Sequence, residues 1–181
     1  MPRQPLQPPT PFRLRPARVD DVPALAAIER LSFGARDAFS PRTLRHLITR
    51  AKAVTVVAES IPARRPLAYA TALLRSAPAR PASARLYSVA VHPMARGQGL
   101  ARKLLNRLLR RLASLHVARV SLEVEATNTP AVALYKSLGF VADKHLPHYY
   151  ARRRHGLRMV RGSRSQTPHR GIETLRDGSR T

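Results

Sequence analysis

A two-glycine turn between a predicted strand and a predicted helix is the first part of the chain that could do chemistry. It reads Arg96-Gly97-Gln98-Gly99-Leu100-Ala101 and fits the spacing Q/R-x-x-G-x-G/A. Gly97 and Gly99 can adopt positive φ and have no Cβ to obstruct a ligand. The first N–H groups of the following helix have no intrahelical partner and lie at the positive end of its dipole. The turn therefore predicts an anion site, and a diphosphate fits it best.

A second motif follows a predicted strand over 120–124, which contains the tripeptide LEV. It reads NTPAVALYKSLGF from Asn128 to Phe140. Together with the R-G-Q-G-L-A turn, these residues resemble the GNAT superfamily of acetyl-CoA-dependent N-acetyltransferases. Within it they are most similar to the ribosomal-protein-alanine N-acetyltransferases, which acetylate the N-terminal amine of a small-subunit ribosomal protein. The similarity is strong over residues 84–150, looser over 12–83 and absent from both tails.

The resemblance implies an α/β (mixed α+β) GNAT acyl-CoA N-acyltransferase fold. Its central mixed, splayed sheet is flanked by helices and has a V-shaped cleft between the fourth and fifth strands. It also implies acetyl-CoA as cosubstrate, while the residues themselves predict no metal. The strand backbone would pair with the pantetheine amides and the turn would take the diphosphate. The implied cofactor-binding residues are Val89, Ala90, Val91, Gly97, Gln98, Gly99, Leu100, Ala101, Arg102 and Asn128. Asn128 has an alternative role, which is to cap the turn before Thr129-Pro130.

Acetyl transfer to an amine requires a proton acceptor for the amine and a proton donor for the departing thiolate. The resemblance makes Glu123, the glutamate of the LEV motif, the general base acting through water. Strand alternation places Glu125 on the same face, so Glu125 could share this role. The alternative for Glu123 is a solvent-facing strand carboxylate. Tyr135 of the LY motif is the implied general acid, and its alternative is packing against Leu134 and Phe140.

The last predicted hairpin departs from the family pattern. In the family this hairpin often carries acidic residues near a tyrosine pair, whereas here Tyr149 and Tyr150 are followed by the basic run 152–155. Either the substrate is more acidic or this edge faces a polyanion. Tyr149 and Tyr150 resemble the wall that holds the first residues of a peptide, with ordinary strand packing as the alternative. The loop over 32–40 would form the opposite wall.

Basicity bears on which amine is acetylated. A peptide α-amine has a pKa of about 8, and a lysine ε-amine has a pKa of about 10.4. Deprotonating lysine at neutral pH is therefore harder by about 3.4 kcal/mol. A single glutamate acting through water thus favours an α-amine, although it does not exclude lysine.

Positive charge dominates the composition, with 33 Lys and Arg against 10 Asp and Glu and a net charge of +23. Such a surface attracts RNA, the ribosome or acidic peptides. Alternatively, the arginine excess reflects a GC-rich coding sequence and the basic surface is simply solvated. The chain has no cysteine, which excludes disulfides, thiolate metal sites and a thiol nucleophile. The histidines do not form a metal-ligand pattern.

Composition divides the chain into three parts. Residues 1–11 are predicted to be a flexible Pro-rich arm, 12–161 a single GNAT N-acetyltransferase domain, and 162–181 a disordered basic tail. No apolar stretch approaches the ~18 residues of a membrane span, and the N-terminus lacks the apolar core of a signal peptide. We therefore expect a cytoplasmic protein without membrane association.

Periodicity and turn signals predict the order strand, two helices, three strands, helix, strand, helix, two strands. The strands are expected at 12–15, 54–59, 67–74, 85–91, 120–124, 140–145 and 157–160, with loops at 76–83 and 147–156. Asp20 and Asp21 should cap the first helix, which presents Leu25, Ile28 and Leu31 on one face until the pattern breaks over 33–39. Ser40-Pro41 should start the second helix. The third, over 99–115, carries a leucine stripe expected in the core, and Gly139 should end the fourth, which starts at Thr129-Pro130.

These residues predict an acetyl-CoA-dependent N-acetyltransferase that acts on a protein N-terminal α-amine, of the ribosomal-protein-alanine type. One alternative keeps the fold and acetylates a small-molecule amine, such as an amino acid, a polyamine or an antibiotic. Another is a basic RNA- or ribosome-binding module with a vestigial acetyl-CoA site. The presence of both Glu123 and Tyr135 speaks against this last alternative.

Overall fold

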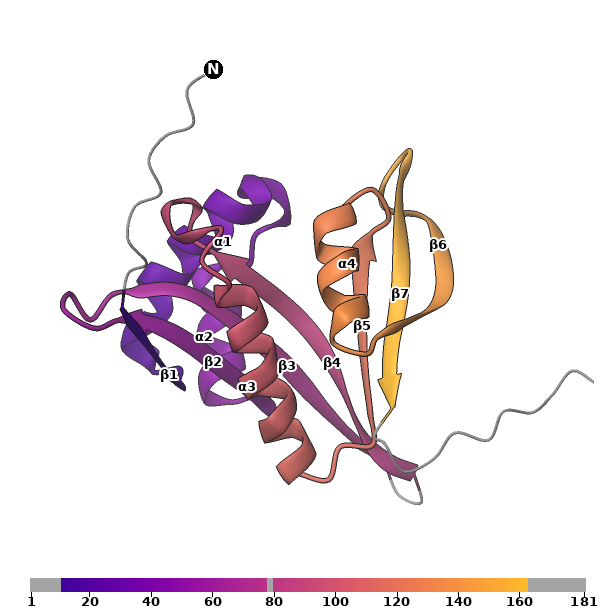
Figure 1. The fold of residues 1–181 in the computed structure, drawn as a ribbon, viewed down its shortest axis with the longest axis horizontal. Helices are drawn as coiled ribbons and strands as arrows, with labels where there is room; N and C mark the ends of the chain where they lie inside the picture. The colour runs from indigo at the N-terminus through magenta and orange to yellow at the C-terminus, as the bar shows by residue number, and fades with distance from the viewer. Residues whose placement is uncertain (1–10, 78–79, 163–181) are drawn as a thin grey trace, which may run out of the picture.

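Seven strands form one sheet in the computed structural model, which describes residues 11–77 and 80–162 (Figure 1). Their spatial order is β1-β2-β3-β4-β5-β7-β6, and β4 and β5 are the parallel neighbours in an otherwise antiparallel sheet. The strands are β1 (Phe12–Pro16), β2 (Ala53–Ser60), β3 (Pro66–Ala77), β4 (Arg80–Val91), β5 (Arg119–Glu125), β6 (Val141–Ala151) and β7 (Arg154–Gly162). The mixed α/β order predicted from the sequence is confirmed.

Four helices cover the two faces of this sheet. They are α1 (Val22–Asp37), α2 (Pro41–Thr49), α3 (Leu100–Ser114) and α4 (Thr129–Ser137), with short 3-10 turns η1 (Val19–Asp21) and η2 (Pro93–Ala95). Figure 1 shows α3 and α4 on the near face and α1 and α2 on the far face. Helix α3 makes the crossover that parallel pairing of β4 with β5 requires.

The main core lies under α3. All six leucines of its stripe are buried against β2–β5, as predicted: Leu100, Leu104, Leu105, Leu108, Leu109 and Leu112. A smaller core on the other face joins α1 and α2 to the sheet, with Leu25 and Ile28 packed against Val57 and Tyr69. The two cores hold β2–β4 rigidly between helices.

The pairing of β4 with β5 is short, and this opens the sheet. Only Ser83, Ala84 and Arg85 of β4 face β5 partners, which are Arg119, Val120 and Ser121. Beyond Arg85 the strands diverge, as Figure 1 shows between β4 and β5. The predicted cleft between the fourth and fifth strands is therefore present.

The loops predicted at 76–83 and 147–156 were both too long. Strand β3 continues to Ala77 and β4 starts at Arg80, because cross-strand pairs such as Arg75 with Ser83 extend the hairpin. Strand β6 likewise continues to Ala151, where it pairs with Arg154. Pro147 does not end β6, because β6 is an edge strand and an edge position tolerates a missing N–H.

Helix α1 differs from its predicted pattern at both ends. Asp21 accepts from the Arg18 N–H (2.7 Å) and from Arg15, and makes no side-chain cap to α1. Leu31 is 53% exposed rather than buried. Each three-residue step turns a helix by about 300°, so position 31 drifts off the buried face while position 29 rotates onto it. Gly34, at φ +76°, kinks the helix inside the predicted break.

The predicted arm and tail lie, apart from residues 11 and 162, outside the described residues. No helix of the described part is long and apolar enough to span a membrane.

Candidate active site

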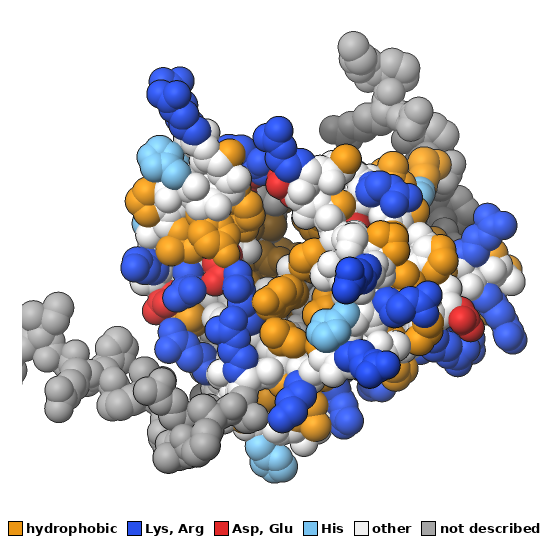
Figure 2. Space-filling view, turned by 180° about the vertical axis from the view of Figure 1, so that it is seen from behind, with side chains coloured by type: hydrophobic (Ala, Val, Ile, Leu, Met, Phe, Trp, Pro, Cys, Tyr) orange, Lys and Arg blue, Asp and Glu red, His pale blue; other side chains and the backbone are white. Residues whose placement is uncertain are grey.

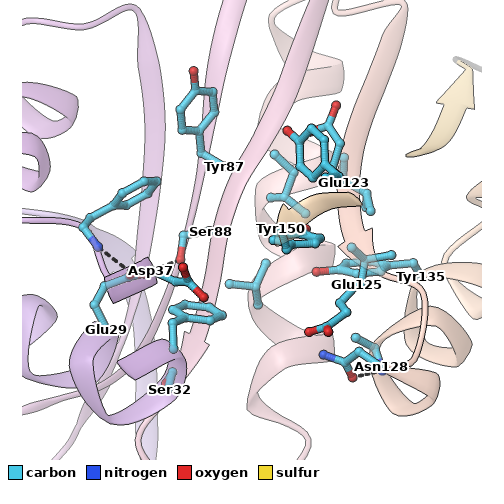
Figure 3. Close-up of a pocket in the computed structure, with 18 of the residues that line it drawn as sticks. Glu29, Ser32, Asp37, Tyr87, Ser88, Glu123, Glu125, Asn128, Tyr135 and Tyr150 are labelled. Carbon is cyan, nitrogen blue, oxygen red and sulfur yellow. Dashed lines mark hydrogen bonds between the residues drawn. The ribbon is translucent and has the colours of Figure 1, made fainter. Parts of the chain in front are cut away.

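A cavity of about 510 Å³ occupies the opening between β4 and β5. Figure 2 shows it as a hollow with Lys and Arg side chains along its rim. In Figure 3, Glu29 and Ser32 of α1 lie on one side of it, and Glu125, Asn128 and Tyr135 lie on the other. Of the predicted site residues, the lining includes Val89, Glu123, Asn128, Tyr135, Tyr149 and Tyr150. The glycine turn is not part of this lining and lies at the start of α3.

The open edge of β4 leads from the cavity towards the glycine turn. Val89, Ala90 and Val91 pair with β3 on one side only, because β5 has already diverged. An extended ligand could therefore add to this edge through backbone hydrogen bonds. The Val91 carbonyl already accepts from Ser32 Oγ and Arg96 Nε, both at 3.4 Å.

The turn has the backbone geometry expected of it. Gly97 and Gly99 adopt φ of +77° and +73°, and a Cβ on either would meet no atom within 4 Å. The helical ladder of α3 begins where the Lys103 N–H donates to the Gly99 carbonyl (3.1 Å). The N–H groups of residues 100–102 precede this ladder, so they can donate to an anion. The Leu100 side chain points into the core, so this residue can contribute only its backbone.

A β-bulge at Tyr87 changes which side chains of β4 face α1. Thr71 pairs with Ser88 and Ala72 with Leu86, so Tyr87 is the additional residue. Leu86 therefore faces the α3 core, whereas Ser88 faces α1. Bulges commonly re-aim side chains beside active sites.

Glu123 is held by two arginines. Its Oε2 accepts from Arg85 Nε (2.7 Å), and its Oε1 accepts from Arg158 Nε and Nη2 (both 3.2 Å). Its side chain is 5% exposed, so it is not the solvent-facing strand carboxylate that the sequence left open. Residues 121, 123 and 125 do share one face of β5, as alternation predicted. The two arginines were not predicted.

Glu125 is held by Arg154, which also reaches across the cavity. Arg154 donates to both oxygens of Glu125 (3.0 Å each) and to Asp37 at the end of α1 (3.2 Å). The hydrogen bonds from Arg154 lower the pKa of the Glu125 carboxyl. Part of the basic run at 152–155 thus faces the carboxylates of the cleft itself.

Tyr135 and Asn128 both line the cavity, and each also makes the packing or capping contact that the sequence left open as its alternative role. The Tyr135 ring packs edge-on to Phe140 at 5.8 Å and also lines the cavity, and burial raises the pKa of Tyr135 to about 12. The Asn128 side chain accepts from the Ala131 N–H (3.2 Å), so it does cap α4.

The tyrosine pair lies in β6 and lines the cavity. Arg85 donates to the Tyr149 hydroxyl (2.8 Å), while Arg154 stacks over the Tyr150 ring. Burial raises the pKa of Tyr150 to about 12. Gly156 fits beneath Tyr149, because a Cβ there would lie 3.1 Å from the Tyr149 Cβ.

The sequence analysis missed Glu29, which is 1% exposed and lines the cavity. It accepts from the Tyr69 hydroxyl, the Ser88 hydroxyl and the Phe39 N–H. None of the ion pairs among the described residues involves Glu29. The available signal was that Glu29 lies one helical turn after Leu25, on the face of α1 that was expected to be buried. The carboxylate ties the wall after α1 to β3 and β4.

Comparisons with known proteins identify the family of this chain. The model of the acetyltransferase (GNAT) family matches residues 23–140, and the chain belongs to this family. The [ribosomal protein bS18]-alanine N-acetyltransferase of Escherichia coli (strain K12) is 45% identical over 67 residues, which are 37% of this chain and 45% of that protein. The chain thus matches less than half the length of this curated relative. A mycothiol acetyltransferase of Acidothermus cellulolyticus is 49% identical over 55 residues, or 30% of this chain and 17% of that protein.

Solved structures share the fold over most of the chain. The crystal structure of the Escherichia coli ribosomal-protein-S18-alanine N-acetyltransferase has a TM-score of 0.70 and 26% identity, covering 83% of this chain and 93% of that one. Arabidopsis thaliana NAA60 in complex with acetyl-CoA has a TM-score of 0.74 and 20% identity, covering 84% and 98%.

Proposed function

We propose that this protein is an acetyl-CoA-dependent N-acetyltransferase that acetylates the N-terminal α-amine of a protein, as the bS18-alanine enzymes do. The observation that carries this proposal is the continuous path from the glycine turn along the β4 edge into a cavity with carboxylate and phenol groups. The identity to the bS18-alanine enzyme supports the choice of an α-amine.

The turn and the β4 edge suit acetyl-CoA by shape. The space in front of Gly97 and Gly99, which a side chain would fill, and the N–H groups of residues 100–102 would hold the diphosphate. The free edge at 89–91 would pair with the pantetheine amides. The thioester would then lie in the cavity, between β4 and the Glu123–Tyr135 side.

Two groups of the cavity would move protons. Glu123 would accept a proton from the incoming ammonium through a water molecule, because both of its oxygens already accept from guanidinium groups. The neutral amine then attacks the acetyl carbonyl, and the carbon–sulfur bond breaks. Tyr135, whose raised pKa of about 12 keeps it protonated at neutral pH, would give its proton to the thiolate. The acetylated nitrogen still carries one extra proton, and its release to the tyrosinate through solvent would complete the amide and restore Tyr135.

A small-molecule amine is the second candidate acceptor. The match to a mycothiol acetyltransferase supports it, since that relative is 49% identical over 55 residues. The two candidates differ in how much of the acceptor the cavity must hold. Association with RNA or the ribosome remains a prediction from charge alone.

The test uses purified protein, acetyl-CoA and two peptides with the same sequence, which begins with Ala and contains one internal Lys. One peptide has a free α-amine, and the other has a blocked one. Mass spectrometry should find a single acetyl group on the free peptide at its N-terminus and none on the blocked peptide. Acetylation of Lys alone, or of polyamines and amino acids but of neither peptide, would contradict the proposal.

A further inference from the structure

A second, smaller recess of about 210 Å³ adjoins the cavity and is lined by four arginines. Arg75 comes from β3, Arg85 from β4, Arg119 from β5 and Arg158 from β7. Glu123 is the carboxylate of its lining, and Arg85 and Glu123 also line the larger cavity. The Arg85–Glu123 ion pair is therefore the partition between the two spaces.

Strand register, and not sequence proximity, brings these arginines together. Arg75, Ser83 and Arg119 are lateral neighbours across β3, β4 and β5. Two positions further on, Arg85 lies beside Ser121. Two more positions along β5, Glu123 pairs with Arg158 of β7. All of them lie on the sheet face opposite α3, where alternation and the short β4–β5 pairing leave them together.

The recess has more positive charge than its own carboxylates neutralise. Glu123 is shared by Arg85 and Arg158. Arg119 contacts Asp143 at 3.4 Å, but these side chains are 56% and 36% exposed, so the pair is weak. Arg75 takes part in none of the ion pairs among the described residues. Guanidinium donors on Arg75 and Arg119 can therefore bind an additional anion.

We propose that this arginine recess binds an acidic side chain of the acceptor, located a few residues after the acetylated amine. This inference rests on the proposed function. A peptide that enters the cavity with its amine near Glu123 can pass over the Arg85–Glu123 partition into the recess. The planar guanidinium groups suit a carboxylate, which they can bind through two parallel hydrogen bonds. Among the described residues, no aromatic side chain lines the recess, so these residues offer no stacking surface of the kind that single-stranded RNA sites use.

The test compares pairs of N-terminal Ala peptides that carry either Glu or Gln at one of positions two to six. At one or two of these positions, kcat/KM should be about tenfold higher for the Glu peptide at low salt, as expected for a charge-assisted hydrogen bond, and the ratio should fall with added salt. In the double variant Arg75→Gln/Arg119→Gln, the ratio of kcat/KM between the Glu and Gln peptides should fall towards one, because the KM of the Glu peptide rises. Asp143→Asn should raise it, because Arg119 loses its competing carboxylate.

Arg107→Gln, an exposed position on α3, is the matched control and should keep the wild-type ratio. Equal rates for Glu and Gln peptides at every position, or a preference that survives in the double variant, would overturn the inference while leaving N-terminal acetylation in place. Loss of oligouridylate binding in the double variant, with no peptide preference in the wild type, would also overturn it in favour of RNA. If no peptide is acetylated, the proposed function fails as well.

Discussion

The two sides of the cleft present different kinds of group to a ligand, backbone groups on one side and side chains on the other. The β4 edge, the glycine turn and the start of α3 present mainly backbone N–H and C=O groups to a ligand. The facing side, formed by β5, β6 and β7, presents carboxylates, arginines and tyrosines. A ligand common to the family can be held by backbone geometry, whereas an acceptor particular to this protein must be selected by side chains. Substitutions on the two sides should therefore have different effects on acetyl-CoA and on the acceptor.

The largest effect is expected for Tyr135→Phe, on the side of the cleft that presents side chains. The substitution removes the proposed proton donor and keeps the ring that packs on Phe140. We expect kcat to fall roughly a hundredfold, the usual order for loss of a general acid. Acetyl-CoA affinity, measured by calorimetry, should change little. A parallel loss of affinity would mean that Tyr135 serves binding and not proton transfer.

The glycine turn should respond in the opposite way. Gly99→Val would place a branched side chain in the open space before the turn and strain a residue at φ +73°. We expect the dissociation constant for acetyl-CoA to rise roughly tenfold, because the valine side chain would occupy the space proposed for the diphosphate, and a lost hydrogen bond to a charged group costs about 1.5–3 kcal/mol. Gly139→Val, at φ +85° outside the turn, controls for strain alone. Equal affinity in folded Gly99→Val and wild type would remove the turn from the binding site.

Arg154 links the two walls, so its loss should affect the acceptor more than the cofactor. In Arg154→Gln, the KM for an N-terminal peptide should rise about threefold, in keeping with exposed ion pairs. The pKa of the Glu125 carboxyl, which Arg154 lowers, should move up towards its ordinary value, as NMR titration can show. Arg152→Gln on the neighbouring turn is the control. An unchanged KM would show that the Arg154 bridge does not shape the acceptor site.

The smallest effect is expected beneath Tyr149. Gly156→Ala would place a Cβ 3.1 Å from the Tyr149 Cβ and displace the tyrosine wall. The free energy of unfolding, measured by thermal denaturation, should fall by about 1 kcal/mol, and the KM for the peptide should rise slightly. Gly162→Ala in the same strand has no neighbour within 4 Å and should be neutral. Equal behaviour of both variants would argue against this close packing.

The same contrast explains what the sequence could predict. The order of strands and helices and the leucine stripe of α3 follow from local periodicity, and they were predicted correctly. The positive φ of Gly97 and Gly99 follows from residue type. These features depend on neighbours along the chain.

The side-chain arrangement depends on register, which the sequence did not specify. Arg85 and Arg158 meet at Glu123 because β4, β5 and β7 are adjacent in the sheet, although they are far apart in the chain. Glu29 of α1 is buried because Tyr69 of β3 and Ser88 of β4 approach it from the sheet. The loop predicted at 147–156 is mostly strand, because β6 pairs with β7 again at Ala151, beyond an irregularity between Leu146 and Ala151.

The central claim is that the backbone side holds acetyl-CoA while Glu123 on the other side accepts the proton of an α-amine. The most direct measurement is the pH–rate profile of Glu123→Gln on an N-terminal Ala peptide, together with its acetyl-CoA affinity. The account predicts unchanged affinity, low activity at about pH 7 and recovery towards about pH 9, where more of the α-amine is already neutral. Arg85 and Arg158 lose their carboxylate in this variant, so a folded state should be verified by circular dichroism. A wild-type profile in folded Glu123→Gln would contradict the account and move the base to another carboxylate, with Glu125 the next to test.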